Sequence, residues 1–470
     1  MVGTAILGLL VSGCSQKSIH LEPSSSSMQK TLSNFPDTGV ALPYTVLRDD
    51  INDIKTHVTF SIRNGGYGSA MTAHPTNERQ FYALTDRGPN ATYKGSFGKG
   101  KKFPSPYYTP KIGLFELQEN GSIKQLKTID LRRPDGTRIT GLPNTSDLGG
   151  TGETPYNIFG LPITVDSTKP FDKNTNPLYL DNYGLDSEGL VAVSDGTFWV
   201  SDEYGPHIVH FDSTGKEIGR INAFKKDTRV SHHLPVEFAN RRVNRGMEGL
   251  AITPDEKKLV GIMQSTMYNP TNAVKNLDMT RIVTIDLKSG DIEQFLYKQD
   301  KAQNSNSEIV ALSNDEYLVI ERDGSFLLGG PKKANQNAQK KVYRISLSSG
   351  TNLETVKTNN DIKQSDELGL TINDMSLEEV VLRFGWDGLS HNGIKAVQKT
   401  EIVDMVKSAS YPHDKMEGLW LIDQQHLGVL NDDDFATWAT KGDLHQKVLG
   451  NRKVDHNRLY IVNTDLTPKK

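Results

Sequence analysis

Apolar and polar positions alternate through residues 186–205 in the pattern of a β-hairpin. Two β-rich runs, Leu190 to Val193 and Phe198 to Ser201, are separated by a polar turn that contains glycine. Such a turn between two such runs predicts antiparallel pairing. Because a hairpin sends the chain out and back, we expect Glu188 at its start and Asp202-Glu203 at its end to lie close together.

The same pattern recurs four more times along the chain. Each copy has an apolar run, a polar turn and a second apolar run that ends in polar residues. Counting the first hairpin, three of the five contain the triplet Glu-Gly-Leu. The further copies begin at 68–71, 247–250, 307–310 and 416–419. Repeats of roughly 40 to 60 residues with several strands each are typical of a β-propeller. The sequence therefore predicts an all-β fold, a β-propeller with five or six four-stranded blades.

The regions between and around the repeats predict the rest of the ring. Residues 42–63 alternate as β-strands and should supply outer strands or the strand that closes the ring, and Leu459 to Val462 form a late strand suited to closing it. Residues 132–183 show no period and are rich in Pro, Gly, Asn and Thr. They predict a long inserted loop, and insertions of this length usually form a binding loop or a lid.

The first 14 residues, MVGTAILGLLVSGC, are apolar and end in the only cysteine of the chain. The stretch is too short to span a membrane, and its end resembles a bacterial lipobox, in which the signal is cut before a cysteine that is then lipidated. An ordinary signal peptide, or an apolar start with a free thiol, is the alternative. We expect a lipoprotein signal at 1–14 with a lipid anchor on Cys14, a flexible tether at 15–38, and a single domain at 39–470.

Composition and missing motifs exclude several classes of function. The 470-residue chain has a net charge of −3 and no basic block, which argues against a nucleic-acid partner. It lacks a Gly-x-Ser-x-Gly elbow, a His-Glu-x-x-His motif and a phosphate-binding glycine loop, which disfavours serine hydrolases, zinc proteases and nucleotide-driven enzymes.

The repeat starts should gather carboxylates at one mouth of the propeller channel, since the first strands of all blades run the same way. Several carboxylates at one mouth raise one another's pKa unless a cation lies between them, and oxygen ligands of this kind suit Ca²⁺. We therefore expect a Ca²⁺ site there; the alternative is that each glutamate caps backbone amides and braces its blade. The expected metal ligands are Glu188, Glu248, Glu308, Glu417, Asp432 and Asp433.

Arginines beside the repeats could hold a phosphate ester, because guanidinium groups make paired contacts to phosphate oxygens; ion pairing with the carboxylates is the alternative. His207 could act as a general acid near neutral pH, or be a plain surface residue. The substrate-binding candidates are Asp86, Arg87, Arg322 and Lys415, and the catalytic candidates are Asp202, Glu203, Arg245, Glu321 and His207.

Five motifs, in this order, resemble those of the family known as esterase-like activity of phytase, or phytase-like. They are Leu84 to Asn90, Trp199 to Pro206, Asn244 to Leu250, Leu318 to Asp323, and Lys415 to Leu419 with Asn431 to Phe435. The resemblance covers about residues 60 to 465 and implies a propeller, a secreted or envelope location and a phosphoester hydrolase activity. The calcium-dependent propeller phytases are a separate group, so their catalytic residues are not transferred. The chain departs from the family at Asn431 to Asp434, where the family tends to show Asn-Asp-Asn-Asp.

These observations together predict a monomeric phosphoester hydrolase, phytase-like or esterase-like, that depends on Ca²⁺ and acts on a small phosphoester or ester. We expect it in the bacterial cell envelope, held to the membrane by the lipid on Cys14. The alternative is a non-catalytic propeller that binds a ligand or a partner protein in the envelope.

Overall fold

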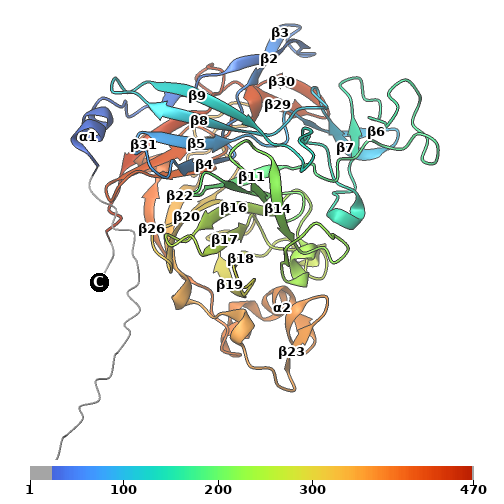
Figure 1. The fold of residues 1–470 in the computed structure, drawn as a ribbon, viewed down its shortest axis with the longest axis vertical. Helices are drawn as coiled ribbons and strands as arrows, with labels where there is room; N and C mark the ends of the chain where they lie inside the picture. The colour runs from blue at the N-terminus through green and yellow to red at the C-terminus, as the bar shows by residue number, and fades with distance from the viewer. Residues whose placement is uncertain (1–23, 468–470) are drawn as a thin grey trace, which may run out of the picture.

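Five four-stranded antiparallel sheets form the body of the protein in a computed structural model that describes residues 24–467 (Figure 1). Blade 1 contains β4 (Ala70–Ala73), β5 (Gln80–Leu84), β8 (Lys111–Leu117) and β9 (Ile123–Asp130). Blade 2 contains β11 (Ser187–Ala192), β12 (Phe198–Asp202), β13 (His207–Phe211) and β14 (Glu217–Asn222), extended by β15 (His232–His233). Blade 3 contains β16 (Met247–Ile252), β17 (Lys258–Met263), β18 (Met279–Asp286) and β19 (Ile292–Lys298). Blade 4 contains β20 (Ser305–Ala311), β21 (Glu316–Arg322), β22 (Lys340–Ser346) and β26 (Gln398–Asp404). Blade 5 contains β27 (Gly418–Leu421), β28 (His426–Leu430), β31 (Arg458–Asn463) and β1 (Val40–Ala41).

The first strands of the five blades close a ring. In the order β4, β11, β16, β20 and β27, each strand lies against the next, and β27 returns to β4. A separate hydrophobic cluster fills each of the five gaps between neighbouring blades; Phe81 of blade 1 and Trp420 of blade 5, for example, lie 5.0 Å apart between ring centroids. The prediction of a β-propeller is confirmed, and the blade number is five.

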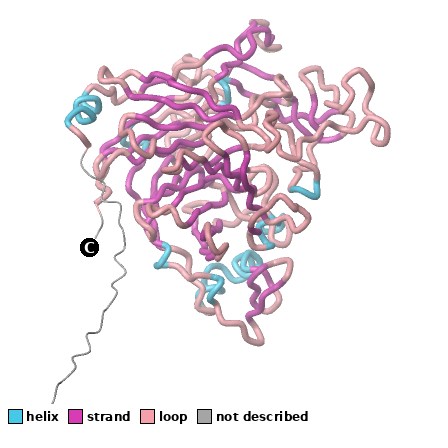
Figure 2. Tube along the Cα trace, viewed as in Figure 1, coloured by secondary structure: helices cyan, strands magenta, loops and turns pink. Residues whose placement is uncertain are grey.

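Four smaller sheets and three α-helices of the described residues decorate the ring (Figure 2). The hairpin β2 (Thr45–Asn52) and β3 (Thr59–Asn64), the hairpin β29 (Thr437–Thr440) and β30 (Asp443–Gln446), and the sheet of β6 (Ala91–Gly95), β7 (Gly98–Lys102) and β10 (Thr154–Tyr156) lie apart from the blades. A lobe of β23 (Ile362–Ser365), β24 (Gly369–Ile372), β25 (Met375–Ser376) and α2 (Leu377–Ser390) interrupts blade 4 and is followed after β26 by α3 (Met405–Ala409). Short 3-10 turns are η1 (Ser146–Leu148), η2 (Val236–Asn240), η3 (Asn272–Val274), η4 (Leu347–Ser349), η5 (Leu353–Thr355) and η6 (Asp434–Ala436). Within residues 24–467, no helix has the length and apolar character needed to cross a bilayer.

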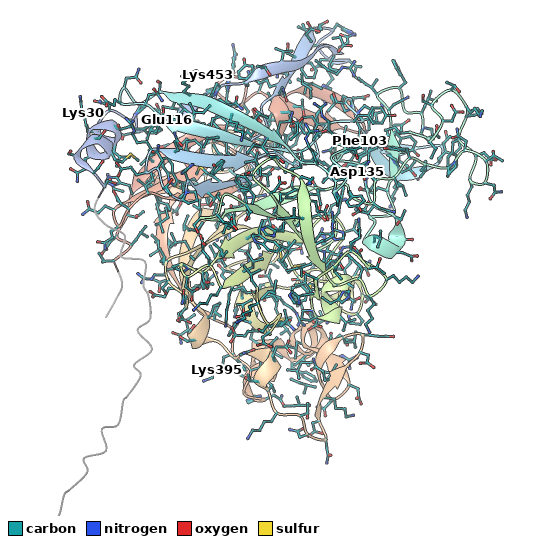
Figure 3. The ribbon with its side chains drawn as sticks, viewed as in Figure 1. Lys30, Phe103, Glu116, Asp135, Lys395 and Lys453 are labelled. Carbon is teal, nitrogen blue, oxygen red and sulfur yellow. The ribbon has the colours of Figure 1, made fainter. Side chains whose placement is uncertain are left out.

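Two expectations about the N-terminal part are wrong. Residues 42–63 do not close the ring, because β2 and β3 pair only with each other, and the closing strand is β1, paired with β31. Residues 24–38 are not a flexible tether. Helix α1 (Ser26–Ser33) is capped by Ser25 and buries Met28 against the cluster between blades 5 and 1, and Figure 3 shows its Lys30 at the same edge as Glu116 of β8. The expected lipobox at 1–14 and the first part of the tether lie outside the described residues.

The Glu-Gly-Leu triplets have a steric explanation. In blades 2 and 3 the pairing skips Glu188 and Glu248, so each glutamate is the extra residue of a β-bulge that re-aims its side chain. The following glycine lies where the next first strand approaches: a Cβ on Gly189 would meet the amide nitrogen of Leu250 at 2.8 Å, and one on Gly249 would meet that of Ile309 at 2.7 Å. Only glycine allows the first strands to pack this closely.

The lobe inserted in blade 4 packs on blade 3. Leu377 and other apolar side chains of the lobe cluster with Met279 and Leu296 of blade 3. Arg281 on β18 is buried and pairs with Glu378 at the start of α2, at 2.9 Å, and with Glu237 of η2, at 3.2 Å. The lobe is thus joined to a neighbouring blade by an apolar contact and a buried ion network.

Candidate functional site

A cavity of about 360 Å³ opens at one mouth of the channel. Its floor is formed by residues at the ends of the repeats, and its walls come from the β6–β7 hairpin, the β29–β30 hairpin and the loop after β21. The charged lining residues are Asp86, Arg87, Lys101, Glu188, Glu203, Arg322, Lys332, Asp414, Lys415 and Asp434. The repeat starts therefore do meet at one mouth, as the strand directions predict.

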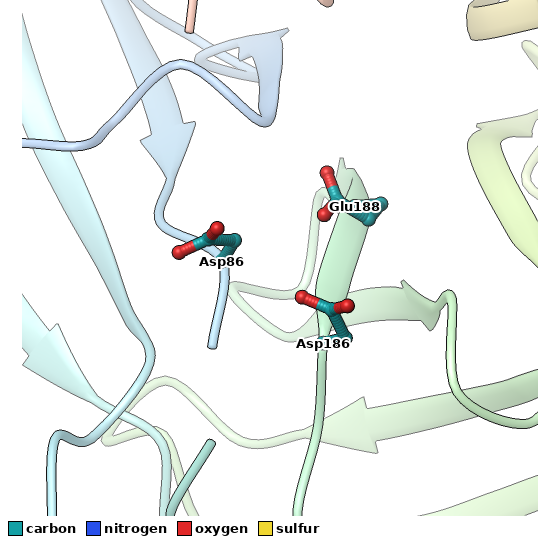
Figure 4. Close-up of side chains that lie close together, drawn as sticks. All are labelled: Asp86, Asp186 and Glu188. Atoms are coloured by element: carbon teal, nitrogen blue, oxygen red, sulfur yellow. The ribbon is translucent and has the colours of Figure 1, made fainter. Parts of the chain in front are cut away.

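Three buried carboxylates lie close together at this mouth (Figure 4). Oxygens of Asp86, Asp186 and Glu188 all lie within 4.8 Å of one another, and the three residues are 7 %, 0 % and 6 % exposed. Asp86 accepts a hydrogen bond from the Gly88 amide at 2.8 Å, and Asp186 pairs with Arg87 at 3.0 Å. Across residues 24–467, the Glu188 carboxylate receives neither a hydrogen bond nor an ion pair.

The electrostatics of the cluster follow from this crowding. Burial and the charge of Glu248 hold the pKa of Glu188 well above its usual range. Burial and the charge of Asp186 raise the pKa of Asp86 to about 7. Burial and the charge of Glu417 raise the pKa of Glu248 to about 8. Glu188 has no ion pair within residues 24–467 and lies among other carboxylates, which is the condition that a bound cation relieves.

Beside this cluster, Arg322 and Gln264 contact the other glutamates of the mouth. Arg322 donates from Nε to the Ser307 hydroxyl at 2.9 Å. Its guanidinium also forms ion pairs with Glu417 and, at 3.9 Å, with Glu248. Gln264 donates to both Glu203 and Glu248, at 2.9 and 2.7 Å. Arg322 thus pairs with the glutamates on one side of the mouth, whereas on the other side Arg87 pairs with Asp186 and Glu188 has no ion pair among the described residues.

Three of the four expected cations, Arg87, Arg322 and Lys415, line the cavity. Lys415 pairs with Asp432 at 2.5 Å and with Asp434 at 2.8 Å, and Arg87 also reaches the Asn244 side chain at 3.1 Å. Arg245 does not line the cavity. Burial lowers the pKa of its guanidinium, and one of its terminal nitrogens is buried without a hydrogen-bond partner.

The structure places Glu308 away from the expected position. In blade 4 the pairing skips Ser307 rather than Glu308, so Ser307 is the counterpart of Glu188 and Glu248, and Glu308 occupies the place of the glycine. The Glu308 carboxylate accepts the Ile309 amide at 2.9 Å inside the channel and does not line the cavity. The contacts of Glu308 therefore fit the alternative in which a glutamate caps backbone amides and braces its blade.

Four other expected residues also have structural partners away from the cavity. Asp202 accepts the amides of Asp186 and Gly205, both at 2.7 Å, and Asp433 accepts that of Phe435 at 3.0 Å. The ring of His207 is buried between the Leu148 carbonyl and the Asn222 side chain, and burial holds its pKa well below the usual range. Glu321 binds Lys399 at 2.6 Å and Tyr297 at 2.9 Å. None of these four lines the cavity.

Sequence reasoning missed four charged residues that line the cavity, Lys101, Lys332, Asp414 and Asp434, and it missed Asp186 beside them. Asp186 directly precedes the first Glu-Gly-Leu strand, and Asp434 belongs to a quoted motif, so both carried a signal. Asp414 and Lys101 carried none, because one lies in a loop and the other on a hairpin outside the repeats.

Residues 62–435 match the family model described as esterase-like activity of phytase. The chain belongs to the phytase-like family. The phytase-like chain is also 29 % identical over 287 residues to a protein of Arthroderma benhamiae named "Uncharacterized secreted protein", an alignment that covers 52 % of this chain and 53 % of the relative. The chain thus spans about half the length of that relative.

Solved structures resemble the phytase-like chain only weakly. The PQQ-bound aldose sugar dehydrogenase of Streptomyces coelicolor has a TM-score of 0.32 and 9 % identity, covering 90 % of this chain and 99 % of its own. The periplasmic gluconolactonase of Pseudomonas aeruginosa has a TM-score of 0.30 and 11 % identity, covering 86 % and 90 %. Similarities of this size carry no argument about function.

The raised pKa values of the mouth predict a pH dependence of stability. Asp86, Asp202 and Glu248 have folded pKa values of about 7, 7 and 8, whereas carboxyl groups in an unfolded chain titrate near about 4. At pH values between the unfolded and folded pKa values, the folded state binds more protons than the unfolded state. The free energy of unfolding should therefore fall as pH rises from about 5 to 8. Melting in chelator across this range checks the sign; a melting temperature that rises with pH would contradict it.

Proposed function

We propose that this protein is a Ca²⁺-dependent phosphoester hydrolase and that the mouth cavity is its active site. The observation that carries the proposal is the buried Glu188 carboxylate, which lies without a partner beside Asp86 and Asp186 in an open cavity. Membership of the phytase-like family supports the reaction class.

The residues around Glu188 fit a hard cation. All three acidic groups offer oxygen, the ligand that Ca²⁺ prefers, and no histidine or cysteine lines the cavity among the described residues. Asp86, Asp186 and Glu188 would hold the ion. Bound there, Ca²⁺ would orient water and stabilise charge on the phosphoryl oxygens.

The position of three cations in the cavity supports phosphate binding. Arg87, Arg322 and Lys415 line it and are each fixed by a carboxylate, so their donors are oriented before a substrate arrives. Guanidinium and ammonium groups in such an arrangement bind phosphoryl oxygens and stabilise the charge that develops on them. Glu203, which also lines the cavity, is the remaining expected catalytic residue in contact with this space.

We propose a location outside the cytoplasm. The relative from Arthroderma benhamiae is named as secreted, and the first 14 residues resemble a lipoprotein signal. Cys14 would carry the lipid that holds the protein to the bacterial envelope, where it would act as a monomer on a small phosphoester.

The full-length protein, stripped of metal with a chelator, tests the proposal. We expect turnover of phosphoesters, and not of carboxylesters, when Ca²⁺ is added, with a rise in melting temperature in the same samples because the ion binds only the folded state. A rise in melting temperature without turnover of any ester would instead identify a non-catalytic binding propeller. Turnover that is indifferent to Ca²⁺ would remove the metal from the proposal.

A further inference from the structure

Two lysines of the cavity, Lys101 and Lys332, have no carboxylate partner among the described residues, and Lys332 donates to the Gly324 carbonyl at 3.1 Å. Lys101 lies on β7 and lines the cavity, and its ammonium donates to the Asn90 side-chain oxygen at 3.0 Å. In the part of the chain that the structure describes, this is its only hydrogen bond, and it has no ion pair. Lys415 in the same cavity pairs with two aspartates.

The turn that carries Asp86 also positions Lys101. The Gly88 amide donates to the Asp86 carboxylate at 2.8 Å, the Gly88 carbonyl accepts from the Asn90 side-chain amide at 3.1 Å, and the Asn90 oxygen faces Lys101. A chain of hydrogen bonds therefore runs from Asp86, one of the proposed metal ligands, to the lysine. The relative position of the two groups is fixed by residues of a single turn.

Strand β7 is paired on both sides at this point. It pairs with β6 on one side and in parallel with β10 on the other. Gly100, next to Lys101, lies so close to β10 that a Cβ would meet the Thr154 carbonyl oxygen at 1.8 Å. A group that must meet one atom of a substrate is held best on such an element.

The electrostatics of Lys101 differ from those of the other cations. Burial and the charge of Arg87 lower the pKa of Lys101 to about 8. The charges of Asp432, Asp434 and Glu417 outweigh burial at Lys415 and raise its pKa well above the usual range. Lys101 is thus the cavity lysine suited to release a proton near neutral pH.

We propose that Lys101 is the general acid that protonates the leaving-group oxygen of the phosphoester. The inference rests on the proposed function. Water attacks phosphorus, the ester P–O bond breaks, and its electron pair stays on the leaving oxygen, which takes a proton from Nζ of Lys101. One proton of the attacking water passes to solvent and solvent returns one to Lys101, so the net reaction consumes one water.

Leaving-group chemistry tests this role in the full-length protein with added Ca²⁺. Glycerol 2-phosphate leaves as an alkoxide that needs a proton, whereas 4-nitrophenyl phosphate leaves as a stable phenolate. We expect Lys101→Met to lower kcat/KM for glycerol 2-phosphate by about 10²- to 10⁴-fold and for 4-nitrophenyl phosphate by less than about tenfold. Lys101→Arg should behave like Lys101→Met, because arginine keeps the charge but does not release the proton.

Lys102→Met is the matched control, since Lys102 is adjacent on β7 and its ammonium lies over the Tyr93 ring, 4.5 Å from the centroid. It should leave both rates unchanged. If Lys101→Arg hydrolysed glycerol 2-phosphate at the wild-type rate, Lys101 would contribute only its charge. If Lys101→Met lost equal activity on both substrates, the role of Lys101 would be structural. Either result overturns the inference. Wild-type protein that hydrolyses neither substrate would overturn the proposed function itself.

A second measurement covers the case in which the variants fail to fold. Acylation of native wild-type protein with limiting acetic anhydride, read by peptide mass spectrometry, reports the free-amine fraction of Lys101. We expect a midpoint near pH 8, moving to about 10.4 in urea, where the lysine is solvated. The same midpoint in both conditions would overturn the inference.

Discussion

Glu188→Gln should abolish Ca²⁺-dependent turnover and, at the same time, stabilise the metal-free protein. The amide removes one of the three ligand carboxylates, and a lost metal is worth several kcal/mol of transition-state stabilisation, so kcat/KM should fall at least about 100-fold. It also removes a buried acid that repels Glu248 and Asp186. Turnover assays and melting in chelator measure the two effects, which have opposite signs.

Glu308→Gln is the matched control, because Glu308 is equally buried in the channel but does not line the cavity. Its Oε1 accepts the Ile309 amide, and a glutamine oxygen can do the same. We expect this variant to keep both its turnover and the rise in melting temperature with Ca²⁺. Normal Ca²⁺ dependence in Glu188→Gln would remove Glu188 from the proposed site.

Arg281→Met should destabilise the protein by about 3–5 kcal/mol, because it leaves Glu237 and Glu378 buried without their cation. Both carboxylates would then be protonated or hydrated, and the lobe that carries α2 would loosen from blade 3. Urea denaturation measures the loss. It should be smaller at low pH, where the two carboxyl groups take up protons.

The triple variant Arg281→Met, Glu237→Gln, Glu378→Gln separates lost charge balance from lost packing. A neutral network should recover most of the stability, because no uncompensated charge remains. Lys226→Met, which breaks the exposed pair between Lys226 and Asp147, should cost less than about 1 kcal/mol. A loss at Arg281 as small as that would show that the network does not hold the lobe.

The ring was predictable from the sequence because each hairpin carries its own signal. Alternation within about 20 residues identified the first two strands of all five blades. Some outer strands instead depend on partners that are distant in sequence, as with β26, which pairs with β22 only after the whole inserted lobe. The two-residue β1 is too short to show any period.

The sequence predicted site residues correctly only where it also indicated the register in which neighbouring strands pair. Glu308 looks like its counterparts in sequence, but a one-residue difference in the bulge exchanges its place with that of Ser307. Asp202 and His207 stand next to site residues, yet their side chains turn into backbone and loop contacts. Lys101 reaches the cavity from a hairpin between blade strands, and nothing in its own stretch of sequence indicates this.

Closure of the last blade by β1 means that the ring cannot be completed in the order of synthesis. Val40 and Ala41 are made early, yet their partners Leu459 and Arg458 come more than 400 residues later. The outer edge of blade 5 is incomplete until β1 pairs with β31, so the segment that is made first can take its place only after the last strand has been made. Synthesis that stops before Arg458 leaves blade 5 without its third strand and β1 without any partner, which makes the closed ring a property of the whole chain.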